Sequence, residues 1–253
     1  MGRVYRALGP DGEVALKAIK PALVADPESR QRFAREARVA AELVHPNLVG
    51  VVEAGEQDGV PYLAQRFLAG GSLAERLRRD GVPALESVLA LCSEVAAGLD
   101  AVHCAGLIHR DVKPGNILFD EAGVAHLTDF GLTKDPAGTV LTRPGQALGS
   151  IDYMAPEQIK GEPVSGATDV YGLGCVVFEC LVGRPPFGDR QPLRVMWAHL
   201  EDPPPDPVEL GAEIPRAVAD AVIGALAKSP AERPQRAPEL ARRVAAAAAT
   251  PDR

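Results

Sequence analysis

The sequence predicts an α+β fold with two lobes: a small antiparallel β-sheet with one helix over residues 1–68, and a larger, mainly helical lobe over residues 69–253. Three observations support this prediction. Short apolar segments separated by glycine- and proline-containing turns dominate the first lobe. Residues 85–105 carry apolar side chains at helical spacing. Residues 169–182 are apolar nearly all round, which is typical of a helix buried in the centre of a lobe.

The first lobe is expected to begin with a β-hairpin, because Gly-Pro-Asp-Gly at residues 9–12 is a strong turn signal. A helix over 28–44 follows, and His45-Pro46-Asn47 ends it, since the residue before a proline disfavours helical backbone. A polar turn at 55–59 separates the last two strands. The four predicted strands are 3–8, 13–20, 48–54 and 60–67.

The second lobe is expected to begin with a short helix that runs to Arg79 and is capped by Ser72. The long helix 85–105 comes next, and Gly106 ends it. Residues 132–154 are loop-like, with Gly, Pro and Thr. The remaining predicted elements are two short strands near 117–119 and 124–127, the buried helix 169–182, and helices over 191–200, 215–228 and 236–249.

Composition narrows the class of protein. The formal net charge of −7 over 253 residues gives no reason to expect nucleic acid as a partner. No apolar stretch approaches the roughly 18 residues that a membrane-spanning helix needs, and no signal peptide is expected. The four cysteines lie in apolar, helix-like contexts without a Cys-x-x-Cys spacing, so we expect reduced core residues in a cytoplasmic protein.

The stretch with the clearest chemistry is His109-Arg110-Asp111-Val112-Lys113-Pro114-Gly115-Asn116, which is followed thirteen residues later by Asp129-Phe130-Gly131. Phosphoryl transfer from a magnesium nucleotide needs a carboxylate at the substrate hydroxyl, an ammonium at the phosphate, and oxygen ligands for the metal. Taken singly, each residue also fits a turn or a solvated surface. Their combined spacing favours the phosphoryl-transfer interpretation.

With these residues the chain resembles the protein kinase family, in particular the bacterial, eukaryotic-like serine/threonine protein kinases. The resemblance implies that Asp111 accepts the proton of the substrate hydroxyl or orients it, and that Lys113 reaches the transferring phosphate. It also implies that Asn116 and Asp129 bind magnesium. ATP and Mg²⁺ are therefore the implied cofactors, and Ser/Thr hydroxyls of proteins are the implied acceptors.

Val14-Ala15-Leu16-Lys17 resembles the strand motif that carries the family's nucleotide-binding lysine. Lys17 would hold phosphates, and Glu36, a carboxylate on a largely apolar helix face, would supply its counter-charge. A surface lysine on an edge strand is the competing interpretation for Lys17. By the same resemblance, the other residues expected at the nucleotide are Gly2 over the phosphates, Val4, Ala15 and Leu118 around adenine, Gln65 at the back of the pocket, and the backbone groups of Arg66 and Leu68.

Two further resemblances imply structural roles. Tyr153-Met154-Ala155-Pro156-Glu157 resembles the segment that closes the family's activation loop. Glu157 is then expected to form a buried ion pair with Arg233. Asp169, at the start of the buried helix, is expected to accept backbone hydrogen bonds from the catalytic loop.

Regulation is also implied by the resemblance. Arg110 directly precedes Asp111, which in this family predicts phosphorylation of the activation loop. Thr139 and Thr142 are the expected acceptors, and plain loop hydroxyls are the competing interpretation. Ser150 occupies the family's usual threonine position near the peptide site and, together with Lys113, favours Ser/Thr over Tyr as the acceptor.

The resemblance departs from the family pattern at the start of the chain. The first strand and the first two glycines of the Gly-rich loop have no counterpart, and Gly2 matches the last glycine. One explanation is an internal Met taken as the initiator. The other is a truncated pseudokinase that acts as a protein-binding scaffold. We expect the first, because Lys17, Asp111 and Asp129 are all present, and we expect a transient homodimer during trans-autophosphorylation.

Overall fold

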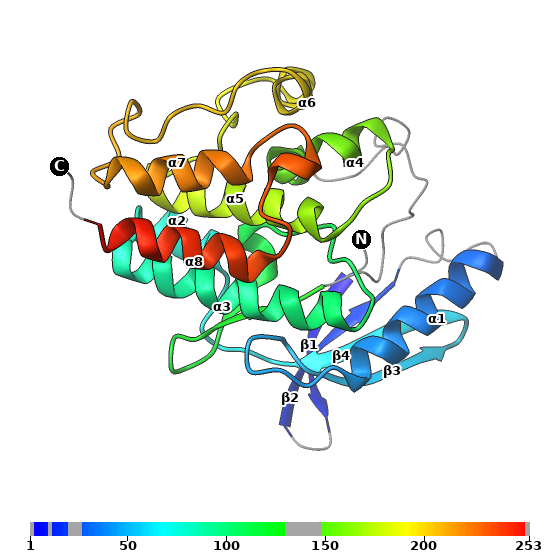
Figure 1. The fold of residues 1–253 in the computed structure, drawn as a ribbon. Helices are drawn as coiled ribbons and strands as arrows, with labels where there is room; N and C mark the ends of the chain where they lie inside the picture. The colour runs from blue at the N-terminus through cyan, green and yellow to red at the C-terminus, as the bar shows by residue number, and fades with distance from the viewer. Residues whose placement is uncertain (1–2, 10–11, 20–26, 130–147, 251–253) are drawn as a thin grey trace.

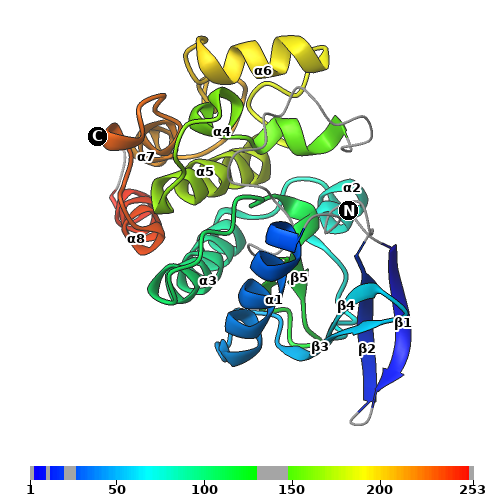
Figure 2. The ribbon, with the colours of Figure 1, turned by 90° about the vertical axis from the view of Figure 1, so that its right-hand side faces the viewer.

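The computed structural model describes residues 3–9, 12–19, 27–129 and 148–250. It has the predicted α+β architecture of a small antiparallel sheet followed by a mainly helical part (Figure 1). Helix α1 (Pro27–Glu42) lies against the sheet, and Figure 2 shows this pair beside helix α3, at the end of the molecule away from α6 to α8. In the described ranges, no helix is long and apolar enough to span a membrane.

The sheet has the order β1-β2-β4-β3, and every neighbouring pair is antiparallel. Its last hairpin is tighter than predicted: Asp58 and Gly59 have φ of 51° and 76°, so two residues of left-handed backbone replace the predicted turn 55–59. The strand before the turn starts later than predicted, because Leu48 pairs with Leu127 outside the sheet. The strands are β1 (Arg3–Gly9), β2 (Gly12–Ala18), β3 (Val51–Gln57) and β4 (Val60–Arg66).

The helical part contains the predicted helices. Ser72 caps α2 as expected: its side chain accepts a hydrogen bond from the Glu75 N–H, and the Glu75 carboxylate accepts one from the Ser72 N–H. One helix, α4 (Pro156–Lys160), was not predicted. The other helices are α2 (Leu73–Asp80), α3 (Leu85–Cys104), α5 (Gly166–Val182), α6 (Pro192–Leu200), α7 (Arg216–Ala225) and α8 (Ala237–Ala248).

Helix α7 ends three residues before the predicted position 228. Just past this end, Arg233 Nε and Nη2 donate hydrogen bonds of 2.7 and 2.9 Å to the carbonyls of Ala227 and Lys228. Those carbonyls are thus satisfied by a guanidinium and not by a continuing helix.

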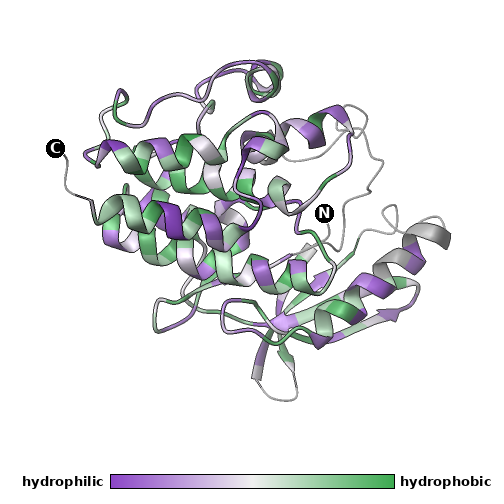
Figure 3. Cartoon of the chain, in the orientation of Figure 1, coloured by the Kyte–Doolittle hydropathy of each residue, from purple (hydrophilic) through white to green (hydrophobic). Residues whose placement is uncertain are grey.

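The core of the helical part surrounds α5, where most side chains from Ala167 to Leu181 are buried. Figure 3 shows hydrophobic and hydrophilic residues alternating along α3, α7 and α8, as expected for helices with one face against a core. The backbone of the predicted catalytic loop lies directly on α5, since a Cβ at Gly172 would lie 3.0 Å from Val112 Cβ. A bulky residue at position 172 would therefore displace the loop.

A small hairpin completes the frame of the site. It consists of β5 (Ile117–Phe119) and β6 (Ala125–Leu127), which pair antiparallel. Two backbone hydrogen bonds join it to the segment after α1: Val49 N–H to Leu127 O at 2.9 Å and Leu127 N–H to Asn47 O at 2.8 Å. These bonds fix the residues that follow β6, including Asp129, relative to the first part of the chain.

Candidate active site

Asp111 lies at the centre of the predicted catalytic loop, between α3 and β5. Its carboxylate Oδ2 accepts a hydrogen bond from Lys113 Nζ at 2.8 Å and one from Asn116 Nδ2 at 3.1 Å. Asn116 Nδ2 also donates to the carbonyl of Asp111 at 2.8 Å. The structure therefore brings together the three residues that the sequence placed at +0, +2 and +5, with the Asp111 side chain largely buried.

The backbone of this loop is held by Asp169 in the first turn of α5. The Asp169 carboxylate accepts the N–H of His109 at 2.8 Å and the N–H of Arg110 at 2.7 Å. His103 Nε2 lies 2.7 Å from the same carboxylate. The predicted hydrogen bonds from Asp169 to the loop are thus confirmed, and the α3 histidine is an addition that the sequence did not indicate. Asp169 is 1% exposed, so water does not compete for these bonds.

Two residues of the site have left-handed backbone: Arg110 has φ of 65° and Asp129 has φ of 64°. Such values are uncommon for residues other than glycine and cost on the order of 1 kcal/mol or more each. Hydrogen bonds fix the backbone at Arg110 and just before Asp129. Gln158 Nε2 donates to the carbonyl of Arg110 at 2.9 Å, and the Thr128 N–H donates to the carbonyl of Asn116 at 3.0 Å.

His109 links the loop to the segment before Asp129. Its ring Nε2 lies 2.9 Å from the carbonyl of Thr128, and its Nδ1 accepts the N–H of Asp111 at 3.2 Å. Complete burial lowers the pKa of His109, although Asp169 and Asp111 oppose this effect. A neutral ring with Nε2–H donating and Nδ1 accepting matches both contacts. His109 therefore connects the loop that carries Asp111 to the segment that leads to Asp129.

Lys17 points from β2 toward the helical part, and its Nζ lies 2.8 Å from Asp129 Oδ2. Its side chain is 7% exposed, so it is not the edge-strand surface lysine that the competing interpretation required. The expected pair between Lys17 and Glu36 is replaced in this structure by the pair with Asp129. Glu36 is half-buried on α1, and it makes other interactions. Which carboxylate faces Lys17 depends on where α1 lies against the sheet, and no local pattern specifies that.

The residues expected around adenine line up across the sheet. Val4 lies opposite Lys17 on the β1–β2 ladder, and Ala15 lies opposite Gln65 on the β2–β4 ladder. Because residues two apart on a strand share a face, Ala15 and Lys17 point to the same side of β2. Gln65 is buried, and its Oε1 accepts the Thr128 hydroxyl at 3.2 Å.

The segment after β4 and the strand β5 complete this set. The N–H of Arg66 donates to Gly50 O at 2.9 Å, so its carbonyl is the group that it could offer to a ligand. The Leu68 N–H makes no hydrogen bond to the described part of the chain. Leu118 is half-buried on β5, between the buried side chains of Ile117 and Phe119.

The predicted ion pair between Glu157 and Arg233 is present. Arg233 Nη1 and Nη2 each donate to one carboxylate oxygen at 2.8 Å, and the two side chains are 0% and 2% exposed. The Thr168 hydroxyl donates to Glu157 Oε1 at 2.8 Å, and Arg233 Nη1 also donates to the carbonyl of Ala167 at 3.0 Å. Burial would raise the pKa of Glu157, but the hydrogen bonds and charge of Arg233 outweigh it and lower that pKa.

Several supporting residues were missed by sequence reasoning. Gln158 is the clearest: it is the third residue of α4, its Oε1 accepts the Ala155 N–H, and its Nε2 reaches the catalytic loop. A Gln three residues after a helix N-cap is a recognisable capping signal. Asn47 is another, since its Nδ2 donates to the carbonyl of Ala125 in the hairpin. That contact joins residues 78 apart and has no local signal.

Some predicted residues lie outside the described ranges. These are Gly2, Phe130, Gly131 and the activation-loop threonines Thr139 and Thr142. Ser150 belongs to the 3₁₀ segment η4 (Leu148–Tyr153) that precedes α4, and only its backbone falls within the described part.

The protein-kinase-domain family model matches residues 1–243 of this sequence, nearly its whole length. The chain belongs to the protein kinase family. The serine/threonine-protein kinase PknE of Mycobacterium tuberculosis is 39% identical over 255 residues, covering 100% of this chain and 45% of the relative. The probable serine/threonine-protein kinase PknB of Lactococcus lactis is 34% identical over 232 residues, covering 90% and 37%. The crystal structure of the M. tuberculosis PknI kinase domain matches with a TM-score of 0.79 at 32% identity, covering 98% of this chain and 92% of that one.

These comparisons place the chain among bacterial serine/threonine protein kinases and confirm the protein-kinase fold. The chain spans less than half the length of the curated relatives it matches. Their names give no support to the alternative of a scaffold without activity.

Proposed function

We propose that this kinase domain transfers the γ-phosphate of ATP to Ser and Thr hydroxyls of proteins. The observation that supports it most directly is the buried Asp111 carboxylate, hydrogen-bonded to Lys113 and Asn116 on a backbone that Asp169 holds. A carboxylate fixed in this way can accept the proton of a substrate hydroxyl or orient it. Lys113 stands beside it to neutralise phosphate charge.

The donor set fits magnesium. Asn116 uses its Nδ2 toward Asp111, which leaves its amide oxygen as an acceptor, and Asp129 adds a carboxylate. Oxygen ligands from few protein groups, completed by nucleotide phosphates and water, are typical of Mg²⁺. In the described ranges, no group of three or more His, Cys, Asp or Glu side chains could hold a metal ion by itself. Asn116 and Asp129 would therefore hold Mg²⁺ together with the nucleotide.

Lys17 would bind the phosphates of the nucleotide. The faces of adenine would pack against Val4, Ala15 and Leu118, and its edge would hydrogen-bond to the backbone of Arg66 and Leu68. Lys17 and Asp129 neutralise each other in this structure. A bound magnesium nucleotide would exchange that contact for a phosphate at Lys17 and a metal ion at Asp129, with Glu36 as the carboxylate proposed to pair with Lys17 in that state. In this proposal the nucleotide binds between the two lobes, residues 1–68 and residues 69–253.

For regulation we propose that a phosphate on Thr139 or Thr142 pairs with Arg110, and that Ser150 contributes to the peptide site. A second copy of the chain would supply the activation loop in trans. We also propose a cytoplasmic location for this domain, in line with its four free cysteines.

The test is incorporation of labelled phosphate from γ-labelled ATP with Mg²⁺ into myelin basic protein and into the chain itself. Asp111→Asn should abolish both, while Asp120→Asn, a change in the turn between β5 and β6, should leave both intact. Mixing wild-type chain with Asp111→Asn chain should label the inactive copy, at sites that peptide mapping assigns to Thr139 or Thr142. If the wild type bound a protein partner but labelled neither myelin basic protein nor itself, the scaffold alternative would be favoured.

A further inference from the structure

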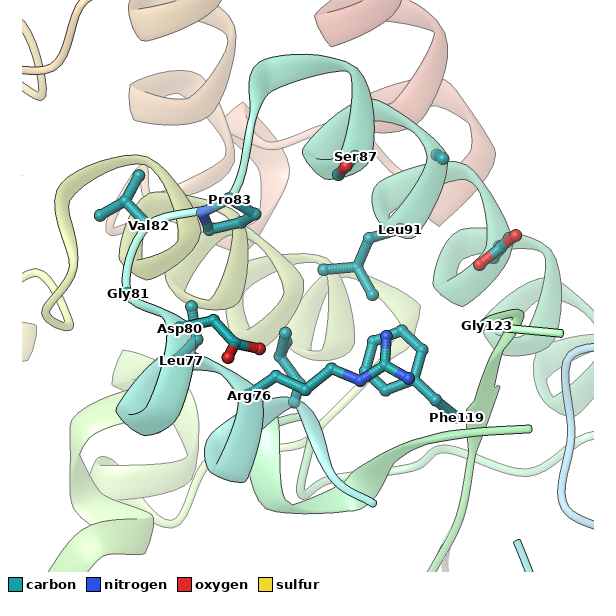
Figure 4. Close-up of a pocket in the computed structure, with 13 residues that line it drawn as sticks. Arg76, Leu77, Asp80, Gly81, Val82, Pro83, Ser87, Leu91, Phe119 and Gly123 are labelled. Carbon is teal, nitrogen blue, oxygen red and sulfur yellow. The ribbon is translucent and has the colours of Figure 1, made fainter. Parts of the chain in front are cut away.

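A hollow lies on the helical part, between α2, α3 and the β5–β6 hairpin (Figure 4). Its volume is about 320 Å³, which is at the lower end of the range for small-molecule sites. Leu77, Leu91 and Phe119 contribute apolar walls. On β5, Phe119 lines this hollow and the adjacent Leu118 points to the opposite face. The hollow is therefore distinct from the proposed nucleotide site.

Arg76 gives the hollow its chemical character. Its guanidinium stacks on the ring of Phe119, with Cζ 3.5 Å from the ring centroid, as Figure 4 shows. Its Nε and Nη2 lie 3.4 and 3.3 Å from the carbonyl of Gly70, which is long for a hydrogen bond. Among the described residues Arg76 forms no ion pair within 4.0 Å. A half-buried, stacked guanidinium with five donors thus retains most of its capacity to bind an anion.

The carboxylates near Arg76 are committed to other partners. Asp80 accepts two hydrogen bonds from Arg79 at 2.7 and 2.8 Å, and Glu94 accepts one from the Ala125 N–H at 2.8 Å. Asp120 accepts one from the Val124 N–H at 2.9 Å and lies 3.1 Å from His126 Nε2. Among the described residues that line the hollow, the guanidinium of Arg76 is the one positively charged group. It lies beside apolar walls, where a charged contact gains strength from the lower local dielectric.

We propose that this hollow binds a small organic acid with an apolar body, with its carboxylate on the guanidinium of Arg76 and its apolar part against Leu77, Leu91 and Phe119. A fork of donors matches a carboxylate in a bidentate geometry. Inorganic phosphate would pair with the guanidinium but would leave the apolar walls unfilled. A neutral apolar ligand would fill the walls and leave the guanidinium without a partner.

The test uses 4-phenylbutyrate as the probe and its uncharged amide, 4-phenylbutyramide, as the comparison, in calorimetric titrations of the purified chain. Charge-assisted hydrogen bonds predict that the acid binds roughly tenfold more tightly than the amide. Arg76→Gln should remove that preference. Arg78→Gln is the matched control, since Arg78 is an exposed arginine on the same helix that does not line the hollow, and it should keep the preference.

A second variant tests the location without altering Arg76. Ala90 is exposed on α3 and lines the hollow, so Ala90→Trp should block it and weaken the acid at least about tenfold while the protein stays folded. The proposal would be overturned if the acid and the amide bound equally well, or if the preference for the acid survived Arg76→Gln. It would also be overturned if Ala90→Trp left binding unchanged, or if ATP displaced the probe. So would the absence of binding at millimolar probe. Failure of phosphotransfer would not, because the two sites are separate.

Discussion

Arg233 and Glu157 form a pair of parallel hydrogen bonds, each 2.8 Å long, between two side chains that are almost completely buried. The pair joins the segment after α7 to the start of α4, across 76 residues of sequence. Because α4 also carries Gln158, which donates to the carbonyl of Arg110, this pair anchors α4 beside the predicted catalytic loop.

Removing either partner of that pair should destabilise the protein strongly. Arg233→Met leaves a buried carboxylate and Glu157→Met a buried guanidinium, and each should cost about 3–5 kcal/mol in the free energy of unfolding. The double variant should recover part of the loss, since no uncompensated charge remains. Urea unfolding measures all three, with Arg243→Met as a control that breaks the exposed Arg243–Glu239 pair and should cost less than about 1 kcal/mol. Equal losses for the single variants and this control would contradict the argument.

Asp169→Asn should reduce phosphotransfer more than nucleotide affinity. The amide can accept only at its oxygen, whereas the carboxylate now accepts from two consecutive N–H groups and faces His103. The backbone of Arg110, already in a strained conformation, then loses a charge-assisted bond, and Asp111 loses its fixed position. We expect kcat to fall at least about 100-fold with a change in KM for ATP of less than about threefold. A fall confined to KM would contradict the positioning role.

Asp129→Asn should abolish the effect of magnesium on nucleotide binding. At a nucleotide concentration of 100 times Kd, a bound ligand stabilises the folded state by about 2.7 kcal/mol, or several degrees in Tm. We expect that shift for the wild type with Mg²⁺ and ATP, and a much smaller one for Asp129→Asn. Asp120→Asn is the matched control because its carboxylate belongs to a surface turn. A full magnesium-dependent shift in Asp129→Asn would remove Asp129 from the proposed metal site.

His199 should make the fold sensitive to mild acid. The ring is 0% exposed, its Nδ1 lies 2.7 Å from the Tyr171 hydroxyl, and burial, aided by the charge of Lys228, lowers its pKa to about 3. An unfolded histidine titrates near 6.5, so the unfolded chain binds the proton first as pH falls. The contribution of His199 is complete above about pH 6.5 and is lost toward pH 3, at up to about 1.4 kcal/mol per pH unit.

Urea unfolding at pH 7, 6 and 5 measures this effect, because most carboxyl groups titrate below that window. His199→Gln should reduce the dependence of unfolding free energy on pH, even if its stability at pH 7 is lower, while the buried His109 keeps part of that dependence. His45→Gln is the control, since His45 is only half-buried. An identical pH slope in the wild type and His199→Gln would contradict the assignment.

The predicted elements agree with the structure where a local signal marks them. Ser72 begins α2 as its capping box requires, and Gly106 follows the end of α3. The errors occur where a distant contact decides. Leu48 is apolar and was predicted to begin the strand 48–54, yet it pairs with Leu127 outside the sheet. Helix α7 stops at Ala225, and the distant Arg233 side chain binds the carbonyls of Ala227 and Lys228 beyond it.

The sequence by itself determined the protein-kinase fold, and its motif spacing predicted that Asp111, Lys113 and Asn116 lie together, as the structure shows. It also determined, through the family resemblance, that Asp169 and Arg233 act as supports. Only the tertiary structure decided that Lys17 pairs with Asp129 and that Arg76 stacks on Phe119 beside an apolar hollow. Both contacts depend on how separately folded segments lie against one another, and packing between distant segments leaves no periodic trace in the sequence.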